Sequence, residues 1–211
     1  MSQSLHAPRG APPGGRTRHL GLVLFDGVDA LDTVGPVDVL TSWTQRHPED
    51  GWAVSCLSAG GGPVVAAQDL VLAAHRAWDR APRLDVLLHP GGPGTRRLLE
   101  DPAHLQWVRA QRARVPLLVA VGTGAVVFAA AGLLTGRCAT THWASLNLLS
   151  ELDPTIVPDV DARFVDDGDL VTSAGVGAGI DVALHLVVRL AGADRAREVR
   201  RHLQYDPRPP V

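Results

Sequence analysis

The feature that most constrains the fold is a repeated transition from a short apolar run to a segment with helical spacing. Three such runs are HLGLVLF at 19–25, LDVLL at 84–88 and LLVAV at 117–121, and leucine and valine dominate each of them. Continuous apolar runs predict strands buried on both faces, and these occur in parallel sheets covered by helices. The sequence therefore predicts an α/β fold with a mostly parallel central sheet.

Further elements are expected around these strands. Strand patterns lie at 51–58, in a hairpin at 63–73, at 138–141 and on both sides of a turn at 167–168, and helical spacing occurs at 33–46, 98–114 with a break near 101–102, 123–134, 144–149, 177–191 and 194–204. Ligands of parallel α/β sheets bind beyond the carboxyl ends of the strands. We therefore expect the loops 26–35, 89–94 and 122–124 to meet in one site.

Length and composition indicate one globular domain, expected at 19–211. Residues 1–18 are polar and rich in proline and glycine, and we expect them to form a disordered tail. The formal net charge of −2 argues against nucleic acid or an anionic membrane as the main partner. No signal-peptide pattern or membrane-spanning run is present, so we expect a cytoplasmic protein. The nine histidines and two cysteines show no metal-ligand spacing, and we expect no metal.

The stretch VAVGTGA at 119–125 has the pattern of a sharp strand-to-helix turn, where many α/β enzymes display a nucleophile. Its apex is Gly122, which has no side chain but adopts a positive φ without steric penalty. The amides of Thr123 and Gly124 would open a helix and could donate to an anion or a developing oxyanion. The alternative is a plain turn that uses glycine for its geometry.

Asp32 stands where a loop passes into the predicted helix 33–46, in the stretch LDTVGP. One interpretation makes it the helix N-cap, a role for which Thr33 competes. The other makes it an acid/base carboxyl whose pKa is raised by an apolar loop. Asp26 and Asp29 in the same loop are expected to be solvated.

Two further stretches supply candidate pocket residues. In HPGGPG at 89–94 the glycines are either turn residues or backbone donors, with Gly92 as the candidate donor. His89 either faces the pocket or bonds to backbone at the strand end. His142 and Trp143 follow a short strand, and we expect them to line the pocket or to order its loop.

Read together, five stretches resemble the ThiJ/PfpI superfamily, and within it the isonitrile hydratase (isocyanide hydratase) branch. They are LDTVGPVDVL (31–40), HPGGPG (89–94), GTGAVVFAAAGLLTGRCATTHWA (122–144), GVGAGIDVALHL (175–186) and LQYDPRPP (203–210). The resemblance covers nearly the whole chain after the first 18 residues. It implies a flavodoxin-like three-layer sandwich, a homodimer with sites near the interface, and a cofactor-free enzyme.

That branch hydrates an isonitrile, R–N≡C, to an N-substituted formamide. The resemblance implies that a cysteine at the turn attacks the isonitrile carbon, that a carboxylate transfers protons and that backbone amides assist. Carried over, the carboxylate is Asp32 and the amide-bearing neighbour is Thr123, while Gly122 occupies the place of the cysteine. A covalent intermediate cannot form on glycine, so the covalent route is closed.

Three explanations for this departure stay open. The first is that the chain is an engineered hydratase, and the second is that it is a catalytically silent small-molecule-binding or sensor protein. The third is an enzyme with non-covalent chemistry centred on Asp32, of the lyase, hydration or cyclisation type. We favour the third, because the acid and the glycine-rich turns remain although the nucleophile is missing. Cys138 could be a relocated nucleophile, although a lone cysteine of this kind is usually a buried thiol.

Overall fold

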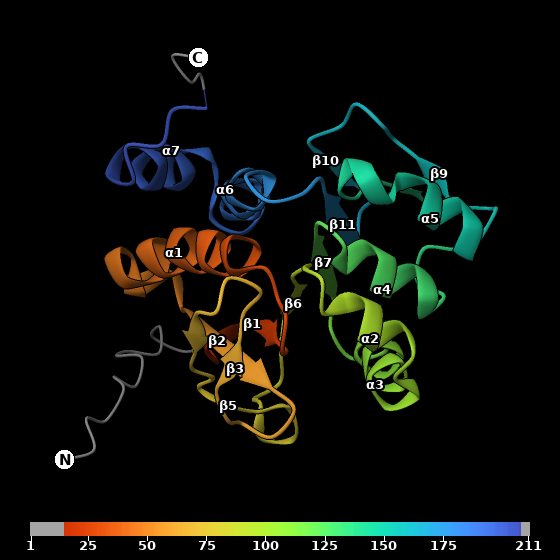
Figure 1. Ribbon diagram of the computed structural model, residues 1–211. Coiled ribbons are helices and arrows are strands. Elements are labelled where there is room, and N and C mark those ends of the chain that lie inside the picture. Colours follow the sequence, from red (N-terminus) through yellow and green to blue (C-terminus); the bar gives the residue numbers. More distant parts are fainter. Residues whose placement is uncertain (1–14, 208–211) are drawn as a thin grey trace.

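A seven-stranded sheet forms the middle layer of the computed structural model, which describes residues 15–207 (Figure 1). Its strand order is β10-β11-β7-β6-β1-β2-β5. All neighbouring strands are parallel except β10 and β11, which are antiparallel. The strands are β1 (Arg18–Leu24), β2 (Trp52–Ser58), β5 (Arg76–Ala77), β6 (Val86–His89), β7 (Leu117–Val121), β10 (Phe164–Asp166) and β11 (Leu170–Ser173). The predicted flavodoxin-like α/β sandwich with a mostly parallel sheet is confirmed.

The helices form the two outer layers (Figure 1). One layer holds α1 (Ala30–Arg46), α6 (Ala178–Ala191) and α7 (Ala193–His202). The other holds α2 (Thr95–Leu99), α3 (Pro102–Arg112), α4 (Gly124–Ala130) and α5 (Leu146–Leu152). The smaller elements are the pairs β3 (Val64–Val65) with β4 (Val71–Leu72) and β8 (Cys138–Ala139) with β9 (Val157–Pro158), and the 3-10 helices η1 (Pro48–Asp50), η2 (Trp78–Arg80) and η3 (Trp143–Ser145).

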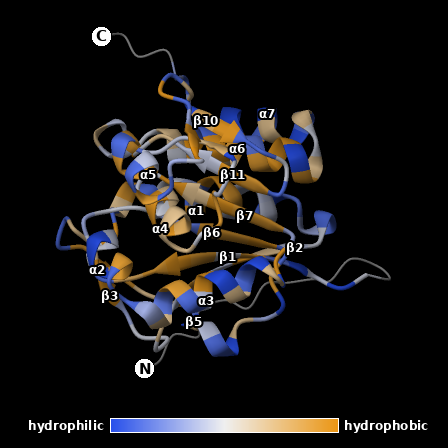
Figure 2. Ribbon diagram, turned by 90° about the vertical axis from the view of Figure 1, so that its right-hand side faces the viewer, coloured by the Kyte–Doolittle hydropathy of each residue, from blue (hydrophilic) through white to orange (hydrophobic). Residues whose placement is uncertain are grey.

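The central strands are buried because helices cover both of their faces. Every residue of β7 and β6 is buried, as are the last five residues of β1. Figure 2 shows these strands as continuous apolar ribbons, whereas α3 alternates between hydrophilic and hydrophobic residues. The apolar runs of the sequence therefore correspond to the core of the sheet.

The structure differs from the sequence expectations mainly at element ends. Helix α1 begins three residues before the predicted start at 33, and α4 ends at Ala130 instead of continuing to 134. The edge strand β5 was not predicted, because its two residues carry no pattern of their own. Residues 1–14 of the expected tail lie outside the described residues. Arg16, which the sequence placed in the tail, pairs with Asp85, and β1 begins at Arg18.

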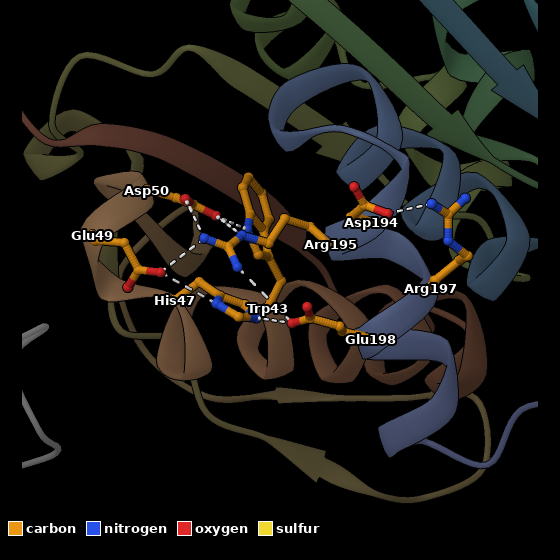
Figure 3. Close-up of polar contacts among 8 residues, drawn as sticks. All are labelled: Trp43, His47, Glu49, Asp50, Asp194, Arg195, Arg197 and Glu198. Carbon is orange, nitrogen blue, oxygen red and sulfur yellow. Dashed lines mark hydrogen bonds and ion pairs between the residues drawn. The ribbon is translucent and has the colours of Figure 1, made fainter.

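A polar network fastens α7 to the end of α1 (Figure 3). The indole N–H of Trp43 donates to Asp50 at 2.7 Å, and the Arg195 guanidinium donates to Asp50 at 3.2 Å and to Glu49 at 2.9 Å. His47 Nε2 lies 2.9 Å from a carboxylate oxygen of Glu198 in α7. These contacts hold the C-terminal helix against α1.

None of the helices in the described part of the chain is both long and apolar enough to cross a bilayer.

Candidate active site

Asp32 lies in the first turn of α1 and does not cap that helix. The cap is Asp29, whose carboxylate accepts hydrogen bonds from the amides of Leu31 at 3.0 Å and of Asp32 at 3.3 Å. Asp29 also accepts from the Gln68 side chain at 2.8 Å, so it has a structural role rather than the solvated position predicted for it. Because Asp29 performs the capping, the Asp32 carboxyl is available for other contacts.

Two loops hold the Asp32 carboxyl from opposite sides. The amide of Gly91 donates to Oδ2 and the amide of Val176 donates to Oδ1, each at 3.1 Å. The residue is only 3% exposed. Burial, followed by the charge of Asp29, raises the pKa of Asp32 from 3.8 to about 6, and the two backbone hydrogen bonds act in the opposite direction. Near neutral pH this carboxyl can therefore both give and accept a proton.

Gly122 occupies the turn between β7 and α4, directly against Asp32. Its φ of +53° lies in the left-handed region, as the sequence predicted. Its amide donates to the Ser173 carbonyl at 3.1 Å, and its carbonyl accepts from the Thr141 hydroxyl at 2.8 Å. A Cβ built on Gly122 would lie 2.7 Å from Asp32 Oδ2, closer than real Cβ contacts come. The carboxyl therefore extends into the space that a side chain at 122 would need.

Backbone amides beside Gly122 make no hydrogen bond in the described structure, whereas those of the 89–94 turn do. Within the part of the chain that the structure describes, the amides of Thr123 and Gly124 have no hydrogen-bond acceptor. The Gly92 amide donates to the Thr123 hydroxyl at 2.9 Å, and the Gly94 amide donates to the Gly27 carbonyl at 2.8 Å. The Gly92 amide is therefore not free to donate to a substrate, and the prediction of Gly92 as a donor is wrong.

His89 lies in the core rather than in a pocket. It is fully buried, its Nδ1 lies 2.8 Å from the Pro90 carbonyl, and its Nε2 lies 2.9 Å from Nε2 of His104. Burial, and then the neighbouring His104, lower the pKa of His89 to about 3, so its ring is neutral at physiological pH. The prediction that His89 faces a pocket is therefore wrong. The alternative, that His89 bonds to backbone at the strand end, is confirmed.

His142 and Trp143 flank the site on the side of α6. The ring of His142 packs so tightly against Gly175 that no Cβ would fit there, and Gly175 lies next to the space above Gly122. Trp143 is 78% exposed, with its ring 5.5 Å from that of His142. Both residues remain candidates for the rim of the site.

The fourth loop of the site, which joins β11 to α6, was not identified from the sequence. Its Val176 has a φ of +49°, which is rare for a β-branched residue, and this conformation accompanies the amide hydrogen bond to Asp32. The glycines at 175 and 177 were the available signal, because glycine pairs of this kind mark irregular loops.

Glycine stands at the apex of the turn, and the two cysteines lie in strands. Cys56 is buried in β2 and Cys138 lies in β8. No three metal-ligating side chains gather among the described residues. The site therefore combines one buried acid, two open amides and a glycine at the apex.

The chain matches the DJ-1/PfpI family over residues 19–189. It is 40% identical over 191 residues to the isonitrile hydratase of Pseudomonas putida, a match that covers 90% of this chain and 80% of that protein. It superposes on the crystal structure of a ThiJ/PfpI family protein from Pseudomonas syringae with a TM-score of 0.84 and 28% identity, covering 100% of this chain and 84% of that one. These likenesses confirm the resemblance that the sequence motifs indicated.

Regulatory proteins are also similar to this chain. It is 33% identical to the HTH-type transcriptional regulator CdhR of Pseudomonas aeruginosa over 84% of this chain. That match covers 52% of the regulator, so the chain spans about half of the regulator's length.

Proposed function

Because the chain belongs to the DJ-1/PfpI family, and shares 40% identity with an isonitrile hydratase, we propose that it is a cofactor-free enzyme of the lyase type acting through Asp32. The observation that carries the proposal is the buried Asp32 carboxyl against Gly122, with a pKa raised to about 6. Hydration of an isonitrile without a covalent intermediate is the reaction that this arrangement supports best. Elimination or ring closure on a biosynthetic intermediate uses the same acid/base chemistry.

The proposed hydration begins with protonated Asp32. Its proton passes to the terminal carbon of R–N≡C, and a water molecule adds to the same carbon. The added water loses a proton to the Asp32 carboxylate, which restores the acid, and the product R–N=CH–OH rearranges to the formamide R–NH–CHO. The atoms balance as one isonitrile and one water giving one formamide.

The open amides have a defined part in this step. Thr123 and Gly124 would donate hydrogen bonds to the oxygen that is added to the substrate carbon. Each Asp32 oxygen accepts one backbone hydrogen bond, and a carboxyl oxygen keeps a further lone pair for water or substrate. General acid/base catalysis contributes about 10²–10⁴-fold, so useful turnover does not require a thiol.

The test is to compare the unsubstituted chain with Asp32→Asn on a panel of alkyl and aryl isonitriles, with formamide detected by mass spectrometry. We expect the substitution to lower the rate by about 10²–10⁴-fold while ligand-induced thermal stabilisation largely persists. Asp38→Asn is the matched control, because Asp38 is an exposed carboxylate on the same helix. Equal rates for the unsubstituted chain and Asp32→Asn would refute the proposal.

A second candidate function is a small-molecule sensor, which the likeness to a transcriptional regulator favours. The site around Asp32 would then bind a ligand without converting it. A sensor predicts thermal stabilisation by a ligand with no product formed over prolonged incubation. Steady product formation at a catalytic rate would exclude this alternative.

Gly122→Cys tests whether the pocket is that of a hydratase whose cysteine has been replaced. Strong formamide production by this variant would mean that the pocket accepts isonitriles and lacks only the nucleophile. If the variant gives none, the pocket has diverged toward another substrate. The thiol would require the Asp32 carboxyl to move, so the structure of the variant should be determined beside its activity.

We also propose that the protein is a homodimer whose interface lies beside the site. Four large apolar side chains are exposed on the elements that carry or flank Asp32: Leu31 (42%), Val34 (46%), Trp143 (78%) and Val176 (38%). Exposed apolar residues on neighbouring elements are typical of subunit interfaces. Light scattering coupled to size exclusion should give twice the chain mass, and Val34→Asp should shift that mass toward the monomer.

A further inference from the structure

Two adjoining cavities lie away from Asp32, beside α3 and the segment that follows β5. The larger has a volume of about 630 Å³ and lies between α3 and residues 78–84. The smaller, of about 430 Å³, lies beside β5 and the glycines at 60–61. Ala59 and Asp79 line both, so the cavities lie next to each other. The larger cavity lies against α3, which belongs to the helix layer on the other face of the sheet from α1 (Figure 1).

Two arginines line each of the cavities. Arg83 and Arg114 line the larger cavity, and Arg76 and Arg80 line the smaller one. Most arginines in the described structure bond to a carboxylate or a carbonyl, whereas the guanidinium groups of these four make no hydrogen bond or ion pair there, and the charge of Arg83 acts on the nearby Asp85 carboxylate. Of the described residues that line the cavities, Asp79 alone is acidic. Four guanidinium groups that make no hydrogen bond, against one lining carboxylate, favour a ligand that carries several negative charges.

An aromatic wall adds a second, independent property to the larger cavity. The rings of Trp78 and Trp107 stack with their centroids 4.3 Å apart and 22° between their planes. The Trp78 indole N–H donates to the Leu57 carbonyl at 3.3 Å, which fixes the ring against the sheet. A fixed pair of stacked indoles offers a flat surface to a planar ring. The ligand that matches the wall and the charges together is therefore a flat ring joined to a strongly anionic group.

We propose that these neighbouring cavities form a second binding site for a small molecule that combines a planar ring with phosphate groups. The ring lies against Trp78 and Trp107, and the phosphates meet Arg83 and Arg114, with Arg76 and Arg80 beside the smaller cavity. The volume of about 630 Å³ falls within the range of small-molecule pockets. None of its lining residues belongs to the Asp32 site, so the two sites are independent.

The probe is ADP, titrated into the full chain by calorimetry, with adenosine and pyrophosphate as its separate halves. We expect ADP to bind at least 10-fold more tightly than either half, because the wall and the arginines each contribute. Binding should weaken as salt is raised, since it depends on ionic contacts. Undetectable binding of ADP, or pyrophosphate binding as tightly as ADP, would overturn the proposal.

The variant that tests the location is the double substitution Arg83→Gln with Arg114→Gln. Both side chains are exposed, so the fold should persist, as circular dichroism will verify. We expect a loss of ADP affinity of 10-fold or more. The matched control is Arg96→Gln with Arg200→Gln, which removes the same charge from two exposed arginines outside the cavities. A control that loses as much affinity as the test variant would reduce the effect to net charge and refute the site.

Discussion

The Asp32 carboxyl lies against Gly122, in the space that a side chain at position 122 would need. Any such side chain would displace Asp32. A Cβ there would lie 2.7 Å from Asp32 Oδ2 and 3.5 Å from the Gly175 α-carbon. Because the Asp32 carboxyl extends into this space, it can keep its position only while residue 122 has no side chain.

Gly122→Ala should destabilise the protein more than a positive φ alone explains. A left-handed conformation costs an alanine about 1–2 kcal/mol, and at Gly122 the new methyl also meets Asp32. Gly132→Ala is the matched control, since its φ is +75° and no atom lies within 4 Å of the added Cβ. Urea unfolding of both variants should show the larger loss for Gly122→Ala. Equal losses would mean that Asp32 moves aside without cost.

Stability should fall as Asp32 ionises. Its pKa is about 6 in the folded chain against an ordinary value of 3.8, so the folded state binds the proton more tightly. The resulting stabilisation is complete below pH 3.8, is lost as the pH rises toward 6, and is absent at neutral pH. The shift corresponds to roughly 3 kcal/mol. The unfolding free energy of the unsubstituted chain should therefore decrease relative to Asp32→Asn by an amount of this order between pH 4 and 7, whereas a constant difference would contradict the raised pKa.

The rate of isonitrile hydration should follow the acid form of Asp32. Below pH 6 the group is mostly protonated, and above it kcat/KM should fall by about tenfold per pH unit, because a proton donor is lost. A pH profile of kcat/KM measures this limb. A rate that rises through pH 6 would mean that Asp32 acts first as a base.

The sequence predicted which loops meet at the site, but not which groups within it form hydrogen bonds with one another. Apolar strand runs placed the loops of Asp32, Gly92 and Gly122 at one edge of the sheet, and the structure brings all three together. The helix cap was expected at Asp32 or Thr33 and is Asp29, because the first turn begins earlier than predicted and local pattern fixes a helix start only to within a few residues. The use of the Gly92 amide by Thr123 depends on a contact between residues 31 positions apart, and no local pattern encodes that contact.

Asp29→Ala should change both the stability of α1 and the acidity of the site. Loss of the cap costs about 1 kcal/mol. Removing the Asp29 charge also lowers the pKa of Asp32, because that charge helps to raise it. The descending limb of the pH profile should then move to lower pH. Asp101→Ala, which removes the cap of α3 in the same way, should cost similar stability and leave the limb in place.

Val176→Gly should relieve strain and leave the acid in position. A β-branched residue at a φ of +49° is strained by about 1–3 kcal/mol, and glycine removes that strain while it keeps the amide that donates to Asp32. The gain is offset in part by the greater freedom of glycine in the unfolded chain, by about 0.4–1 kcal/mol.

Asp69→Gly is the control, because Asp69 has a φ of +58° outside the site and aspartate tolerates that region better than valine. Thermal unfolding should therefore show a larger gain, or a smaller loss, for Val176→Gly than for Asp69→Gly, with the pH limb of activity unchanged. A shifted limb would mean that the valine side chain, and not only its amide, sets the environment of Asp32.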